Sequence, residues 1–312
     1  MRIRTYRDSS DLFAIGRLLR RANGRDPHCN AWSVARFDIW AQRRLAEERL
    51  QGECGWQSEL RLWEDESGLQ GAAFFPDSNT FRPSDGLTAL ALDPAHRNLA
   101  PEMLDWIEER HPAAGLPAGR LRQMEAKQGH PALGALLERR GFTRPADCMI
   151  QRKRLLQAQV DGAAPRRSLP EGFRIVPAAG EAGMEQFVRA VDGVFHMLDS
   201  LDTFQVVRQA PSAVPELDLM VLSPQGEAAA FCSLWLDIQN NLAEFEPVGT
   251  LPAFRKLGLG AALLDEACRR LAKSGVAVAA VESWSESPAA NRLYESVELA
   301  EVDRIYGWEK RD

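Results

Sequence analysis

The spacing of apolar residues along residues 173–312 separates helices from strands. Apolar residues three or four positions apart, as on one face of a helix, predict helices over 184–198, 202–208, 261–273 and 287–296. Short runs of apolar and β-branched residues between turn residues predict strands over 173–176, 218–222, 228–237, 242–250, 276–281 and 300–309. The predicted order is therefore strand, two helices, three strands, helix, strand, helix, strand.

The first half of the chain shows a similar but shorter series. The pattern predicts strands near 3–6, 59–64 and 69–75 and a strand from Leu87 onwards, and helices near 12–22, 32–48, 100–110 and 131–140. In this half the strand from Leu87 ends in Pro94-x-x-Arg97.

Two landmarks indicate that one unit occurs twice. Pro94-x-x-Arg97 recurs as Pro252-x-x-Arg255 at an offset of 158 residues, and His130-Pro-Ala recurs as Ser287-Pro-Ala at an offset of 157. The segment between the copies, 157–172, is polar and rich in Pro and Gly, as linkers are. We therefore predict one domain over 1–156, a linker over 157–172 and a second domain over 173–312.

Composition narrows the class of protein. A chain of 312 residues with 45% hydrophobic and 26% charged residues is typical of a soluble protein of two domains. The net charge of -6 argues against nucleic acid as a partner, and no apolar run is long enough to span a membrane. The first residues show no hydrophobic signal core. Five cysteines without a Cys-x-x-Cys pair indicate reduced thiols, with neither a disulfide framework nor a metal site, in a cytoplasmic protein.

The turn after the strand 242–250 is the main candidate for chemistry. It reads Arg255-Lys-Leu-Gly258-Leu-Gly260 and leads into the helix 261–273. A helix start has unpaired N–H groups and the positive end of the dipole, and glycines let an anion approach them. The P-loop pattern fails because Gly260 is followed by Ala261, and the dinucleotide pattern fails because residue 263 is Leu. An ordinary strand–helix turn rich in glycine is the alternative.

The pattern Arg-x-x-Gly-x-Gly after a strand, with Pro three residues before the Arg, resembles the coenzyme A loop of the GNAT acyltransferases. The predicted order of elements is similar to that of the GNAT fold. The resemblance implies an α/β fold of two tandem GNAT domains, each a mixed, mostly antiparallel sheet flanked by helices, in a layout similar to that of the mycothiol synthases. It implies acetyl-coenzyme A as the acyl donor. The residues it places at this cofactor are Val248, Gly249, Thr250, Arg255, Lys256, Leu257, Gly258, Leu259, Gly260, Ala261, Ser287 and Asn291.

The resemblance also suggests catalytic residues. Glu244 and Glu246 share one face of their strand, and either could accept a proton from an amine or merely form a salt bridge. Tyr294 matches the tyrosine that protonates the departing sulfur in this family. Ser287 stands where the family has Asn, which puts the pantetheine contacts in question, and Asn291 is a candidate substitute. Pro247 predicts a bulge, because proline cannot donate to a strand ladder.

The first copy has lost these features. Its loop contains Pro101 and Glu102, which remove an amide donor and add a negative charge where a phosphate would bind. Leu137 stands where the second copy has Tyr294. We interpret 1–156 as a degenerate GNAT-like domain; cofactor binding by both copies is the alternative.

These features predict an N-acetyltransferase that moves an acetyl group from acetyl-coenzyme A to a primary amine of a small molecule or peptide. The partners are then an amine substrate and at most a second copy of the chain, with neither nucleic acid nor membrane. Two rival hypotheses are a non-catalytic acyl-coenzyme A sensor and a scaffold that binds nothing.

Overall fold

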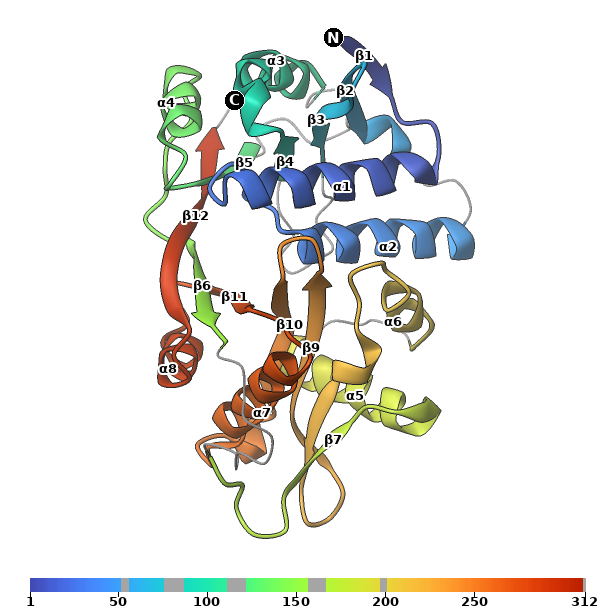
Figure 1. Ribbon diagram of the computed structural model, residues 1–312, viewed down its shortest axis with the longest axis vertical. Coiled ribbons are helices and arrows are strands. Elements are labelled where there is room, and N and C mark those ends of the chain that lie inside the picture. Colours follow the sequence, from blue (N-terminus) through green and yellow to red (C-terminus); the bar gives the residue numbers. More distant parts are fainter. Residues whose placement is uncertain (52–55, 76–86, 111–121, 157–166, 197–200, 311–312) are drawn as a thin grey trace. The chain divides into compact units, whose positions relative to one another are not determined.

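The computed structural model describes residues 1–51, 56–75, 87–110, 122–156, 167–196 and 201–310 (Figure 1). These residues form two compact units: unit 1 is Met1–Ile150 with Asp303–Asp312, and unit 2 is Gln151–Val302. The boundaries predicted from the linker follow the repeat, whereas the compact units divide at different places. The last strand of the chain belongs mainly to unit 1, and most of the strand before the linker belongs to unit 2.

Unit 1 is a mixed sheet covered by helices on both faces. Its elements are β1 Arg2–Thr5, α1 Ser9–Arg25, α2 Val34–Gln51, β2 Leu60–Asp65, β3 Gly68–Phe74, β4 Leu87–Leu92, α3 Ala100–Arg110, β5 Arg122–Lys127, α4 Pro131–Arg139 and the greater part of β12 Ala300–Lys310. The strand order is β1-β2-β3-β4-β5-β12. β4 and β5 run parallel, and the other recorded pairs are antiparallel.

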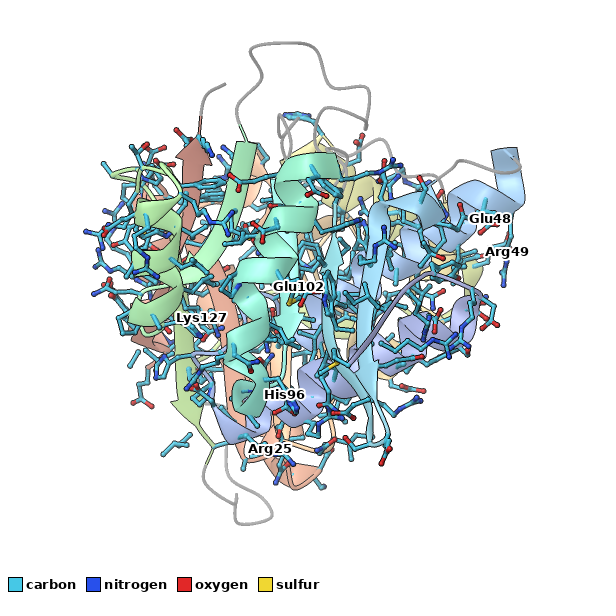
Figure 2. All side chains as sticks on the ribbon, turned by 90° about the horizontal axis from the view of Figure 1, so that it is seen from above. Arg25, Glu48, Arg49, His96, Glu102 and Lys127 are labelled. Carbon is cyan, nitrogen blue, oxygen red and sulfur yellow. The ribbon has the colours of Figure 1, made fainter. Side chains whose placement is uncertain are left out.

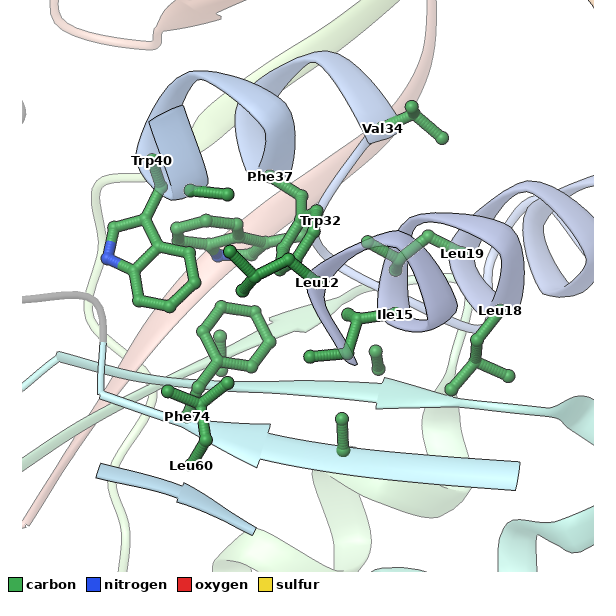
Figure 3. Packing of buried hydrophobic residues seen from close by; sticks show 14 of the residues in the cluster. Leu12, Ile15, Leu18, Leu19, Trp32, Val34, Phe37, Trp40, Leu60 and Phe74 are labelled. Atoms are coloured by element: carbon green, nitrogen blue, oxygen red, sulfur yellow. The ribbon is translucent and has the colours of Figure 1, made fainter. Parts of the chain in front are cut away.

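Side chains alternate between the two faces of the sheet of unit 1 and pack into two hydrophobic cores, one on each face. On one face Phe74 packs with Ile15 of α1 and with Phe37 and Trp40 of α2 (Figure 3). On the other face Ala73, its neighbour in β3, packs with α3 and α4. Successive residues of β3 therefore face opposite layers, as a period of two requires.

Unit 2 repeats this architecture. Its elements are most of β6 Met149–Leu155, then β7 Arg174–Pro177, α5 Gly180–Phe195, α6 Leu201–Val207, β8 Leu219–Leu222, β9 Ala228–Asp237, β10 Leu242–Thr250, α7 Leu259–Lys273, β11 Val278–Trp284 and α8 Pro288–Ser296. The strand order is β6-β11-β10-β9-β8-β7. β10 and β11 run parallel, and β7, β8, β9 and β10 pair antiparallel.

Two cores also flank the sheet of unit 2. One contains the leucines of α7, Tyr294 of α8 and Phe245 of β10. The other contains Phe187 of α5, Phe204 of α6 and Phe231 of β9. Both cores lie entirely within residues 151–302, so unit 2 has a hydrophobic core of its own.

The predicted fold class is confirmed, and two strands were missed. α4 and α8 begin 157 residues apart, as the repeat predicts. β5 and β6 were not predicted, because both carry charged residues at buried positions, among them Glu125 and Arg152. None of the described helices combines the length and apolar composition that a membrane span requires. Four of the five cysteines are described, and all four are buried.

Candidate active site

The bulge predicted at Pro247 is present in β10. The register between β10 and β9 shifts between Phe245 and Val248, and the Glu246–Pro247 peptide is cis. On the other side, among the residues that the structure describes, β10 pairs with β11 only over Leu242–Phe245. The end of β10 therefore separates from β11, as expected of a strand that admits a ligand.

The ladder around the bulge decides which amide faces this gap. Leu251 N donates to Ala229 O of β9 at 3.0 Å. Because donors alternate along an antiparallel strand, the N–H of Gly249 points towards β9 and that of Val248 points the other way. Of these two predicted donors, Val248 is the one placed for a thioester or pantetheine oxygen.

The turn before α7 leaves a helix start that no described side chain caps. Gly258 precedes the helix with a φ of 77°. A Cβ at Gly258 would meet nothing within 4 Å in the described chain, so the space beside this residue is open. Lys256, exposed beside it, has a φ of 66°. Open amides at the positive end of the helix dipole suit the diphosphate of coenzyme A.

The other loop residues have roles within the protein. A Cβ on Gly260 would lie 3.3 Å from Leu293 Cδ2 and from Thr250 Oγ1, so this glycine allows α7 to pack closely against α8 and β10. Arg255 Nε donates to Thr250 O at 3.2 Å, which fixes the start of the turn. Leu259 is buried in the core, Ala261 is half-buried and Leu257 is exposed.

The proposed acid and one of the proposed bases influence each other electrostatically. Tyr294 is only 6% exposed. Burial raises the pKa of Tyr294, the charge of Glu246 raises this pKa further, and the charge of Arg152 lowers it. Glu244 is buried in β10 opposite Trp235 and Ala280 and is not among these charges. Of the two predicted bases, Glu246 in the bulge of β10 is therefore the one whose charge acts on Tyr294.

Asn291 and Ser287 lie at the start of α8. Asn291 Oδ1 accepts a hydrogen bond from Ser283 Oγ at 2.8 Å, and Asn291 Nδ2 donates to the carbonyls of Trp284 and Ser285 at 3.2 Å. These bonds hold the turn between β11 and α8. Ser287 is the N-cap residue of α8 and is half-buried, and no described side chain caps this helix. Their contact with a cofactor stays a prediction.

Arg152 was not among the residues predicted for the site. It lies in β6 with 2% of its surface exposed, and its Nη1 donates to Ser283 Oγ at 3.0 Å. No helical or alternating pattern marks this residue, because its strand reads Met-Ile-Gln-Arg-Lys-Arg-Leu. Among sequence signals, only the short apolar pair Met149-Ile150 hints at a buried strand.

Trp235, Arg208 and Asp218 form a buried group that is bonded to the bulge of β10. Trp235 Nε1 donates to Glu246 O at 2.5 Å, at the point where the ladder is interrupted. The guanidinium of Arg208 lies 4.4 Å from the Trp235 ring centroid and is bonded through Nε to Asp218 Oδ2 at 2.9 Å. Burial raises the pKa of Asp218 to about 6, against the lowering effect of Arg208. This chain of contacts fixes the carbonyl of the candidate base.

Trp235→Phe is expected to lower kcat about tenfold while leaving the dissociation constant of coenzyme A within about twofold. The change removes one hydrogen bond, worth roughly 0.5–1.5 kcal/mol, from the bulge and keeps an aromatic ring for Arg208. Thiol release and calorimetry measure the two quantities. An unchanged kcat would show that the bulge keeps its shape without the indole.

In unit 1 the corresponding loop, residues 93–102, has charged side chains that are paired within the protein. Arg97 is bonded to Asp26, and Arg21 and Arg25 are bonded to the buried Asp93. Glu102, labelled on α3 in Figure 2, accepts a hydrogen bond from Trp63 Nε1 at 3.3 Å. Arg97 and Asp93 are thus paired with residues of α1 and its C-cap, which agrees with the interpretation of a degenerate copy.

Comparisons with known proteins agree with this geometry. A model of the acetyltransferase (GNAT) family matches residues 195–298. A GCN5-related N-acetyltransferase from Sphaerobacter thermophilus superposes with a TM-score of 0.66 at 19% identity, over 99% of this chain and 95% of that one. A tandem GNAT protein from the clavulanic acid biosynthesis pathway gives 0.61 at 12% identity, over 99% and 98%. Saccharomyces cerevisiae N-myristoyltransferase with bound myristoyl-CoA gives 0.58 at 13%, over 99% and 77%. No curated protein matches the sequence significantly.

The structural likenesses, all below 25% identity, concern the fold and its duplication, and the family match concerns most of unit 2, including β10, α7 and α8. Residues 195–298 thus match the acetyltransferase (GNAT) family, and the chain as a whole is similar in fold to a tandem GNAT protein.

Proposed function

We propose that unit 2 transfers an acetyl group from acetyl-coenzyme A to a primary amine of a small molecule or peptide, in the cytoplasm. The observation that supports this proposal is that the charge of Glu246, at the bulge where β10 leaves β11, acts on the buried hydroxyl of Tyr294. The uncapped start of α7 then binds the diphosphate. The acceptor is an amine, so neither nucleic acid nor membrane takes part, and a monomer or homodimer suffices.

Glu246, Val248 and Tyr294 have different roles in the proposed reaction. Bound acetyl-coenzyme A supplies an activated thioester. Glu246 accepts a proton from the acceptor ammonium, directly or through water, so that the neutral amine can attack. The outward N–H of Val248 stabilises negative charge on the carbonyl oxygen. Tyr294 donates its proton to the departing sulfur. Glu244 is the alternative base.

Thiol release from acetyl-coenzyme A with a panel of primary amines tests the proposal. Tyr294→Phe and Glu246→Gln are each expected to lower kcat by about 10²–10⁴-fold, the usual contribution of general acid–base catalysis. Binding of acetyl-coenzyme A, measured by calorimetry, should change little. Tyr306→Phe is a matched control, since this tyrosine lies in unit 1, where its hydroxyl donates to Gln128.

The rival functions give other results. Tight binding of acetyl-coenzyme A without turnover of any amine would identify a sensor and overturn the proposed reaction. Absence of any heat or thermal shift with coenzyme A would identify a scaffold. Equal losses in Glu244→Gln with none in Glu246→Gln would move the base to Glu244.

A further inference from the structure

Arg152 is a buried cation whose charge is incompletely balanced. Among the described residues its one ion-pair partner is Glu295, 3.4 Å away, and the side chain of Glu295 is 63% exposed. Arg152 Nε is buried and has no hydrogen-bond acceptor among the described residues. Buried charges in proteins are normally paired and fully hydrogen-bonded. An anion that forms during the reaction would complete this site.

The surroundings of Arg152 show where that anion would form. Arg152 Nη1 is bonded to Ser283 Oγ of β11, and Ser283 is bonded in turn to Asn291 of α8. Glu295, its partner on α8, follows Tyr294 directly. Arg152 therefore lies between the end of β11 and the helix that carries the proposed acid.

Tyr294 needs such a charge to act as an acid. A thiol has an ordinary pKa of about 8.5, whereas burial and the charge of Glu246 raise the pKa of Tyr294. Proton transfer from a weaker acid to a thiolate is unfavourable by a factor of ten for each pKa unit of difference. Of the charges that act on Tyr294, that of Arg152 opposes this rise.

We infer that Arg152 is a positioning residue of the active site, which stabilises the negative charge that passes between the departing sulfur and the Tyr294 oxygen. This inference rests on the proposed function. A residue from the strand before the linker thereby completes a site whose other members follow the linker, and it is a buried, incompletely paired cation beside the helix of the proposed acid.

The proton and bond changes balance without another reagent. The amine nitrogen forms a bond to the carbonyl carbon, and the carbon–sulfur bond breaks with its electron pair on sulfur. Tyr294 gives its proton to sulfur. The nitrogen of the ammonium loses two protons: one restores Tyr294 through Glu246 or water, and the other leaves to solvent. Arg152 keeps its charge throughout and faces an anion only while the proton moves.

The thiol of bound coenzyme A reports this charge directly. We would titrate it through the ultraviolet absorbance of the thiolate, with coenzyme A itself as the probe and the full chain as the protein. The wild type is expected to bind the thiol with a pKa below that of free coenzyme A. Arg152→Met should raise the bound value by at least about one pH unit, the usual effect of removing a nearby opposite charge. Arg152→Lys should retain most of the wild-type value.

Two further variants separate charge from folding. Glu295→Gln removes the exposed partner, so it is expected to leave the fold intact and to lower the pKa of the bound thiol further. Arg154→Met is the matched control: Arg154 lies two residues along β6 and is bonded to Asp265 and to Val297 O. It should lower the melting temperature and leave the thiol unchanged.

The outcomes are distinct. Coenzyme A that binds with the same thiol pKa in the wild type, Arg152→Met and Glu295→Gln would overturn the role of Arg152 and leave the proposed function standing. Should Arg152→Met not fold, the other two variants decide. If the thiol of coenzyme A has the same pKa bound to Glu295→Gln and to Arg152→Lys as it has free in solution, the role of Arg152 is overturned equally. Failure of the wild type to bind coenzyme A would overturn the proposed function, and the inference with it.

Discussion

Residues 173–312 expressed alone are expected to give no folded domain, whereas residues 151–302 are expected to fold. The first fragment is the one that the linker suggests. It lacks the part of β6 that belongs to unit 2, and it keeps Asp303–Asp312, which belongs to unit 1. The second fragment corresponds to unit 2 and contains both of its cores.

The expected loss comes mainly from one buried carboxylate. The side chain of Asp265 in α7 is 5% exposed, and it is paired with Arg154 at 3.2 Å and with Arg167 at 3.0 Å. The fragment 173–312 lacks both arginines, so Asp265 would be buried without a counter-charge. Leaving a buried charge unpaired costs about 3–5 kcal/mol, a large share of the 5–15 kcal/mol that stabilises a typical domain. The fragment also lacks the strand that lies beside β11.

Circular dichroism and thermal melting of the two fragments decide this prediction. We expect a cooperative melt for 151–302 and none for 173–312. Asp265→Asn in the fragment 173–312 offers a control, since it removes the unpaired charge and should recover part of the structure. A cooperative melt of unmodified 173–312 at the temperature of 151–302 would show that β6 and its arginines are dispensable.

The sequence predicts those elements whose apolar residues recur at the regular spacing of a helix or a strand. The bounds of β9 and β10 agree with the predicted ranges, and α3 and α8 agree within a residue, because most of their buried residues are apolar. β5 and β6 depart from this rule. Glu125 is buried because Trp32 and Arg36 donate to it from about ninety positions away in the chain. Partners so distant in sequence leave no local pattern.

In the candidate site, too, features that depend on local sequence could be predicted, and features that depend on distant contacts could not. The bulge at Pro247 could be predicted, because a missing donor is a local property, whereas the left-handed conformation of Gly258 appears only in the fold. Gly260 was assigned to phosphate approach alone, and its packing against Leu293 appears only in the fold. Arg152 could not be identified, because a single arginine in a polar strand is ordinarily exposed.

Gly249→Ala is expected to destabilise the protein by at least about 3 kcal/mol, at the upper end of the usual effect of overpacking. A Cβ at this position would lie 2.3 Å from Cζ of Phe231, inside any permitted contact. Phe231 is fully buried, and its ring lies 5.5 Å from that of Phe187 and 6.2 Å from that of Phe195. The ring therefore has little room to move, and β10 must shift instead. Because Gly249 follows the bulge, the shift should also weaken binding of coenzyme A.

Denaturant unfolding of a double-mutant cycle measures this contact. Phe231→Leu alone should cost about 1–2 kcal/mol through the lost ring contacts. In the double variant the shorter side chain makes room for the new methyl group, so the combined loss should be clearly smaller than the sum of the single losses. Gly307→Ala is the matched control, since this glycine also lies in a strand and a Cβ there would meet nothing within 4 Å of the described chain. If Gly249→Ala unfolds at the same denaturant concentration as Gly307→Ala, the Phe231 ring yields easily, and the close approach of β10 to β9 does not hold the bulge in place.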